Sequence, residues 1–148
     1  SGTAVAEILE RLVSFDTTSH KTNIPLIEYV EAYLGAHGVA SCRVPNDDGS
    51  KASLFATIGP AGEAGVALSG HTDVVPVEGQ AWDTDPFSLF ERDGQYFGRG
   101  TTDMKGFLAC ALAAVPRFMA TNLTKPIHLA FSYDEEVGCI GVRPMIEK

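Results

Sequence analysis

A helix-length segment that is apolar on nearly every side most constrains the fold of this 148-residue chain. Residues 104–115 read Met-Lys-Gly-Phe-Leu-Ala-Cys-Ala-Leu-Ala-Ala-Val, with a single charged side chain. A helix of this kind is buried rather than half exposed, so other elements must surround it. The run is also much shorter than the roughly 20 apolar residues that cross a membrane. We therefore expect a buried helix in a folded domain, kinked or ended by Pro116.

Short strands alternate with helices around this segment. Apolar residues at helical spacing predict a first helix over 5–13, and a second that is capped by Thr22 or Asn23 and ends at Gly38. The remaining expected segments are strands at 41–45, 52–58, 66–69 and 127–133, an irregular stretch at 75–93, and the start of a helix within 138–148. This order predicts one α/β domain, a sheet with helices on both faces.

Composition and charge exclude several classes of protein. Hydrophobic residues make up 45% of the chain and charged residues 20%, which excludes a disordered chain. The net charge of −8 argues against nonspecific binding to nucleic acid or to an anionic membrane. The three cysteines form no CxxC pair, and the first residues do not resemble a signal peptide. We therefore expect idle thiols in a reducing compartment, and a cytoplasmic protein.

Three groups of polar residues stand where chemistry is expected in such a fold. His71 and Asp73 follow one predicted strand, and Glu135 and Glu136 follow another. Asp103 stands between a glycine-rich turn and the apolar helix. In open α/β sheets, ligands bind at the carboxyl ends of the strands. These side chains are therefore expected to converge on one site.

Each group also has a purely structural interpretation. His71 and Asp73 are either turn residues, or a metal ligand and the carboxylate that orients it. Asp103 is either the N-cap of the helix or a carboxylate that bridges two metal ions. Glu135 and Glu136 are either a solvated loop, or a general base beside a metal ligand.

Other motifs do not carry a function. Gly98-Arg99-Gly100 is similar to a dinucleotide-binding loop, but Asp103 stands where that motif has glycine and would repel a pyrophosphate. No Gly-x-Ser-x-Gly nucleophile elbow is present. His128 alternates with apolar residues and is expected to be structural, and Cys139 is expected to be a packed neighbour of the glutamate pair rather than a ligand.

Taken together, the three groups resemble the signatures of the co-catalytic zinc amidohydrolases. This metallopeptidase family includes acetylornithine deacetylase, succinyl-diaminopimelate desuccinylase, aminoacylase and glutamate carboxypeptidase. The resembling segments are Ser-Gly-His-Thr-Asp-Val-Val-Pro at 69–76, Gly-Arg-Gly-Thr-Thr-Asp-Met-Lys-Gly at 98–106 and Ser-Tyr-Asp-Glu-Glu-Val-Gly at 132–138. Their order and spacing also match, and the resemblance covers nearly the whole chain. Within the family, the residues of these segments are most similar to those of the acetylornithine deacetylase branch.

The resemblance implies a three-layer, zinc-exopeptidase-like fold and a site for two divalent metal ions. Zinc is the expected metal, with cobalt or manganese as alternatives. By this resemblance, His71 binds one metal ion, Glu136 binds the other, and Asp103 bridges both. Asp73 supports His71, and Glu135 is the catalytic general base.

The implied reaction is hydrolysis of the amide bond of an N-acyl amino acid. The expected substrate is N2-acetylornithine, which yields ornithine and acetate as in arginine biosynthesis. Succinyl-diaminopimelate or another N-acyl amino acid is the alternative substrate. A noncatalytic α/β interaction module is the alternative from a different class. The resemblance also implies a cis peptide bond between Asp103 and Met104.

Counting metal ligands predicts that this site is incomplete. Catalytic zinc usually takes about three protein ligands plus water, so each ion lacks one protein ligand here. In the family these ligands come from later segments, and a separate domain serves dimerisation and closes over the substrate. We therefore expect residues 1–148 to be the N-terminal portion of the catalytic domain, without the lid domain and the C-terminal part. Such a piece is expected to be inactive alone, and the full-length protein to be a homodimer.

Overall fold

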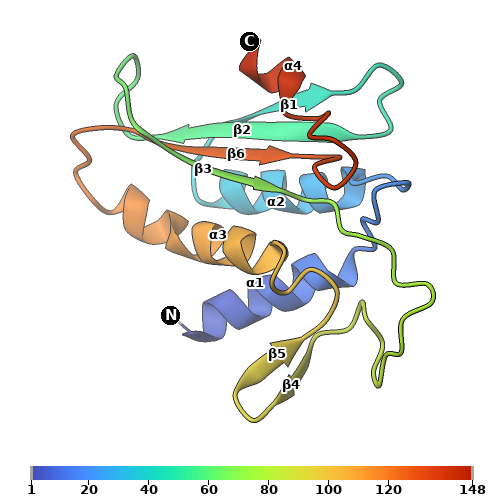
Figure 1. The fold of residues 1–148 in the computed structure, drawn as a ribbon. Helices are drawn as coiled ribbons and strands as arrows, with labels where there is room; N and C mark the ends of the chain where they lie inside the picture. The colour runs from blue at the N-terminus through green and yellow to red at the C-terminus, as the bar shows by residue number, and fades with distance from the viewer. Residues whose placement is uncertain (1, 148) are drawn as a thin grey trace.

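The computed structural model describes residues 2–147, which form a four-stranded sheet with helices on both faces (Figure 1). In spatial order the strands are β1 (Ser41–Pro45), β2 (Ala52–Ile58), β6 (Ile127–Ser132) and β3 (Val66–His71). β2 pairs antiparallel with both β1 and β6, whereas β3 runs parallel to β6. The carboxyl ends of β3 and β6 therefore meet at one edge, where His71 is paired with Ser132.

The helices cover the two faces of the sheet unequally. They are α1 (Gly2–Ser14), α2 (Ile24–Ala36), α3 (Lys105–Met119) and the short α4 (Arg143–Ile146). Figure 1 shows α2 and α3 beneath the sheet and α4 above it. α1 packs against α3. The predicted α/β fold with helices on both faces is confirmed, and the larger helical layer lies on one face.

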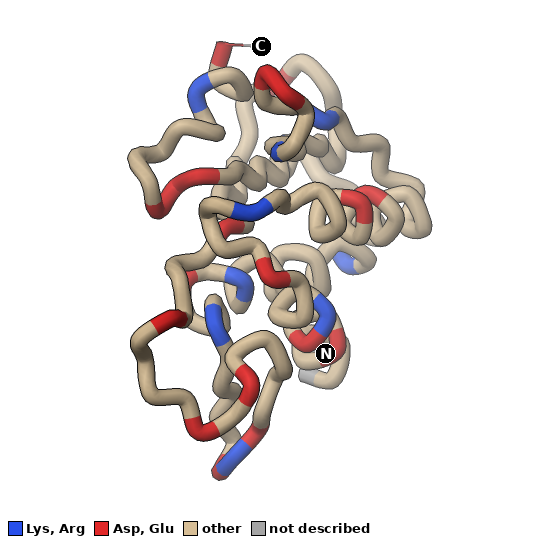
Figure 2. The backbone as a smooth tube through the Cα atoms, turned by 90° about the vertical axis from the view of Figure 1, so that its right-hand side faces the viewer, with Lys and Arg blue, Asp and Glu red and all other residues tan. Residues whose placement is uncertain are grey.

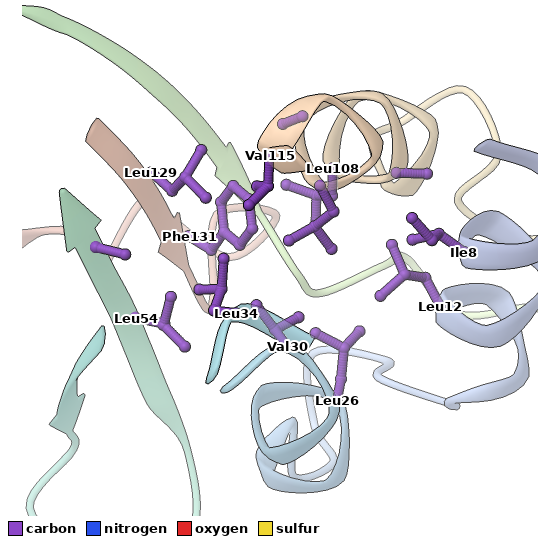
Figure 3. Close-up of a cluster of buried hydrophobic side chains, with 14 of the residues drawn as sticks. Ile8, Leu12, Leu26, Val30, Leu34, Leu54, Leu108, Val115, Leu129 and Phe131 are labelled. Atoms are coloured by element: carbon purple, nitrogen blue, oxygen red, sulfur yellow. The ribbon is translucent and has the colours of Figure 1, made fainter. Parts of the chain in front are cut away.

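The apolar core lies between the sheet and this helical layer (Figure 3). Every second residue of β2 faces the helices, so Leu54, Ala56 and Ile58 are buried there. Leu129 and Phe131 of β6 point to the same side. Burying a large apolar side chain contributes about 1.5–3 kcal/mol. The core thus fixes β2 and β6. The candidate site lies where β6 and its neighbour β3 end.

The apolar helix α3 is less buried than the sequence predicted. Leu108, Leu112 and Val115 are fully buried, but Phe107 is 38% exposed and Met119 46% exposed. The reason is that α3 is covered on two sides, by α1 and by the sheet, within a single helical layer. Pro116 does not end the helix, which continues to Met119.

A β-hairpin begins within the stretch predicted to be irregular and ends beyond it. β4 (Phe90–Arg92) and β5 (Gln95–Phe97) pair antiparallel, separate from the main sheet. The turn residues Asp93 and Gly94 have φ values of 54° and 73°, as a tight hairpin turn requires. The prediction missed β4 because only three residues pair.

The chain has 19 acidic and 11 basic residues, and Figure 2 shows both kinds spread over the backbone. Between residues 2 and 147, no helix is both long and apolar enough to cross a bilayer. The three cysteines are free thiols, and all three are exposed rather than buried.

Candidate metal centre at the carboxyl ends of β3 and β6

His71 is the last residue of β3, and its imidazole is held in one orientation. The side chain is 5% exposed. Its Nδ1 lies 2.9 Å from the backbone oxygen of Asp73, which leaves Nε2 directed at the site. Burial alone would lower the pKa of His71, but hydrogen bonds to Asp73 and Asp103 outweigh it and raise the pKa to about 9. The carboxylates around His71 therefore favour positive charge on this imidazole.

Asp73 is buried and organises the residues around it. Its carboxylate accepts hydrogen bonds from the Ser19 hydroxyl at 2.6 Å and from the backbone N–H of Glu135 at 3.1 Å. The backbone N–H of Glu136 lies 3.3 Å from the same carboxylate. Burial would raise the pKa of Asp73, but hydrogen bonds from His71 and Ser19 hold it below its ordinary value. Asp73 thus stays ionised and supports both His71 and the glutamate pair.

Asp103 precedes α3 but does not cap it. Met104 occupies the N-cap position, and no side chain bonds to the first turn. The Asp103 carboxylate lies across the site instead, with Oδ1 3.0 Å from Nε2 of His71. Its side chain is 70% exposed, so it can accept a further partner. The interpretation of Asp103 as a helix cap is wrong, and the predicted cis peptide bond between Asp103 and Met104 is confirmed.

Glu135 and Glu136 follow β6 and face the same centre. Oε2 of Glu135 lies 3.6 Å from Nε2 of His71, and its side chain is 44% exposed. Ligand atoms of His71, Glu135 and Glu136 all lie within 4.8 Å of one another. Burial, together with the nearby charge of Asp103, raises the pKa of Glu136. Such crowding of carboxylates is costly unless a cation compensates it.

The side chains present fit a divalent metal ion. The ligand atoms of one tetrahedral zinc ion, bound at about 2.0–2.2 Å, lie about 3.3–3.6 Å apart. His71 Nε2 and Asp103 Oδ1 are 3.0 Å apart, a hydrogen-bond distance slightly shorter than that separation. The donor set of one imidazole and several carboxylates is one that zinc accepts. Hollows flank this centre, one lined by His71 and Glu135, the other by Asp103 and Glu136. A small substrate can therefore reach both glutamates.

Two supporting residues escaped prediction. Ser19 belongs to a polar segment that the sequence marks only as a turn, yet it is 8% exposed and bonds to Asp73. Asn23 was expected to cap α2, and it occupies the N-cap position without a capping hydrogen bond. Its amide bonds instead to the backbone of Ala52 and to the Thr72 hydroxyl. The run of hydroxyl residues before α2 was a signal that this segment makes polar contacts. The sequence does not show which residues it contacts.

Of the remaining candidates, His128 makes structural contacts, whereas Cys139 is not packed as predicted. His128 stacks on Phe55, and its Nδ1 lies 2.9 Å from the hydroxyl of Thr57. This pair lies near the opposite end of the sheet from His71. Cys139 lies beside Glu135, with Sγ 3.8 Å from Oε1, and its side chain is exposed rather than packed.

Curated relatives of this chain are acetylornithine deacetylases. The chain is 40% identical over 135 residues to the enzyme of Pasteurella multocida, which covers 90% of the chain and 35% of that protein. It is 42% identical over 149 residues to the enzyme of Myxococcus xanthus, covering 97% of the chain and 38% of that protein. The chain thus spans a little more than a third of the length of these relatives.

Solved structures and a family model agree with this similarity. The fold matches human carnosine dipeptidase 1 with a TM-score of 0.83 and 26% identity, over 98% of this chain and 35% of that one. An M20 family metallo-carboxypeptidase of Sulfolobus solfataricus has the same fold, with a TM-score of 0.79 and 24% identity, over 97% of this chain and 33% of that one. The model of peptidase family M20/M25/M40 matches residues 67–148, more than half of the chain. The chain therefore belongs to peptidase family M20/M25/M40.

Proposed function

We propose that this chain supplies part of the catalytic centre of a metal-dependent amidohydrolase that deacetylates N2-acetylornithine. The convergence of His71, Asp103, Glu135 and Glu136 at one sheet edge carries this proposal. Similarity to acetylornithine deacetylases over 90–97% of the chain supports the choice of substrate. The products are ornithine and acetate, a step that belongs to arginine biosynthesis.

Three side chains would hold the metal ions. His71 would offer Nε2 as a ligand, and Glu136 and the exposed carboxylate of Asp103 would offer oxygen ligands. Zinc is the favoured metal, and cobalt or manganese would accept the same imidazole and carboxylate ligands. Such ions polarise an acyl carbonyl and make water a better nucleophile at neutral pH.

Glu135 is the general base in this proposal. Its carboxylate faces the centre, and its exposure leaves it open to water and substrate. Glu135 takes a proton from the attacking water, whose oxygen joins the acyl carbon. The carbon–nitrogen bond then breaks, and Glu135 returns the proton to the departing amine. Asp73 keeps the backbone of Glu135 in place through its hydrogen bond to that N–H.

We expect this activity to require more of the protein than the 148 residues. Residues 1–148 would be the N-terminal portion of the catalytic domain, since they span about a third of the relatives. Each metal ion still needs one further protein ligand to reach the usual number for catalytic zinc. A further domain would close the site and form a homodimer. The isolated chain is therefore expected to be inactive.

The test compares two substrates on the full-length protein. We expect acetate release from N2-acetylornithine and little succinate release from N-succinyl-diaminopimelate. Removing zinc with a chelator should abolish the activity, and adding zinc should restore it. Preference for the succinyl substrate would overturn the substrate assignment. A protein that binds zinc and hydrolyses neither compound would overturn both substrate assignments and leave another N-acyl amino acid as the alternative. A protein that binds no metal would support the noncatalytic module.

A further inference from the structure

The segment that joins α1 to α2 is bonded to the end of β3 along its backbone. Thr18 and Val74 form an isolated parallel bridge. The N–H of Ser19 donates to the carbonyl of Val74 at 3.1 Å, and the N–H of Val74 donates to the carbonyl of Thr17 at 3.1 Å. Thr17, Thr18 and Ser19 are 2%, 3% and 8% exposed. This segment is thus packed against the strand end beside Asp73 rather than a surface turn.

The hydroxyl of Ser19 bonds to the carboxylate that supports both glutamates. It donates to Oδ2 of Asp73 at 2.6 Å, the shortest contact that this carboxylate makes. Oδ1 accepts the backbone N–H of Glu135, and the N–H of Glu136 lies near Oδ2. Rotation of the Asp73 carboxylate would therefore disturb the backbone of both glutamates together.

Lys51 makes a second connection between the same two segments. Its ammonium donates to the backbone oxygen of Ser19 and, at 2.6 Å, to Oδ1 of Asp134. Asp134 immediately precedes the glutamate pair, and the side chain of Lys51 is 15% exposed. The position of Ser19 is therefore coupled to the glutamate loop through its backbone as well as through its hydroxyl.

We propose that Ser19 is a positioning residue, which fixes the Asp73 carboxylate and through it Glu135 and Glu136. This inference rests on the proposed function, because it assigns Ser19 a role in the metal centre. Without the hydroxyl, Oδ2 of Asp73 loses its closest donor and the carboxylate gains rotational freedom. Mutation of an outer-shell partner typically lowers metal affinity or activity by about 10–100-fold.

The experiment measures zinc affinity, turnover and thermal stability of the full-length protein and its variants. Zinc affinity is measured by competition with a chromogenic chelator, and kcat and KM with N2-acetylornithine. Ser19→Ala should weaken zinc binding and lower kcat about 10–100-fold, while KM changes much less. Ser19→Thr keeps a hydroxyl and should recover most of the zinc affinity.

Thr57→Val is the matched control, since it removes a hydroxyl that bonds to His128 far from the site. It should lower the melting temperature to a similar degree as Ser19→Ala and leave zinc affinity and kcat unchanged. The inference would be overturned if Ser19→Ala had wild-type zinc affinity. It would also be overturned if Ser19→Ala and Thr57→Val lost zinc affinity and kcat equally. If the wild type binds zinc but does not hydrolyse N2-acetylornithine, the substrate proposal fails. The zinc affinity of the variants alone then decides the role of Ser19. A wild type that binds no zinc overturns both.

Discussion

The core beneath the sheet and the edge at the ends of β3 and β6 are held together by different forces. Beneath the sheet, side chains such as Leu54, Leu108 and Phe131 are fully buried and uncharged. At the edge, one histidine lies among carboxylates that repel one another. The difference teaches that apolar packing holds the core together, whereas the edge gathers carboxylates whose repulsion a cation would offset.

The largest expected effect is on catalysis at the edge. Glu135→Gln removes the proposed base, and kcat should fall by about 10²–10⁴-fold, the usual contribution of general base catalysis. Stability and zinc content should stay close to wild type, because Glu135 is 44% exposed and is not assigned as a ligand. Steady-state kinetics and metal analysis measure these quantities. Glu63→Gln, an exposed glutamate between β2 and β3, is the control. Full activity of Glu135→Gln would contradict the assignment.

The next effect concerns stability of the core. Phe131→Ala leaves a cavity between β6 and the helices and should lower the free energy of unfolding by about 3–5 kcal/mol. Chemical denaturation measures this loss. Met119→Ala on α3 should cost much less, because that side chain is 46% exposed. Equal losses in the two variants would mean that the core is not packed as described.

Zinc should stabilise the edge without changing the core. Zinc at about 100 times its dissociation constant should raise the free energy of unfolding by about 2.7 kcal/mol, if the unfolded chain does not bind it. A chelator should reverse the gain, as followed by thermal unfolding of the full-length protein. Phe131→Ala should show the same zinc-dependent gain as wild type, whereas His71→Ala should show little. A gain that survives His71→Ala would locate the metal elsewhere.

The smallest expected effect is a loss of stability at Gly70, where the core meets the edge of the sheet. A Cβ on Gly70 would lie 2.8 Å from Cδ2 of Leu108 and 3.0 Å from Cε of Met104, so glycine allows α3 to approach β3. Gly70→Ala should destabilise the protein by about 1–3 kcal/mol through overpacking. Gly35→Ala in α2, with no atom within 4 Å of the new Cβ, should be neutral or stabilising. A neutral Gly70→Ala, measured by denaturation, would show that this contact is loose.

The sequence predicted the parts of this structure that local patterns specify. Each strand of the main sheet is a short run bounded by turns, and His71 and the glutamate pair stand at the ends of two such strands, whereas Asp103 precedes the apolar helix. The order of strands and helices was enough to place these residues at one sheet edge. Their resemblance to a known family added the roles, which remain proposals, and the cis bond before Met104, which is confirmed.

What the sequence could not show are contacts between distant segments. Ser19 lies 54 positions from Asp73, and nothing in its own neighbourhood indicates which carboxylate it meets. Asn23 has the residue type and place of a helix cap, but its amide bonds to Ala52 and Thr72 instead. The exposure of α3 was also missed, because hydrophobicity shows what can be buried and not which elements cover it.

Anomalous X-ray diffraction at the zinc absorption edge tests the central claim most directly. The measurement uses crystals of the full-length protein grown with zinc. The account predicts two zinc peaks at the carboxyl ends of β3 and β6, one on Nε2 of His71 and one on Glu136, with Asp103 bound to both. No zinc at this edge, or zinc bound without His71 and Asp103, would contradict it.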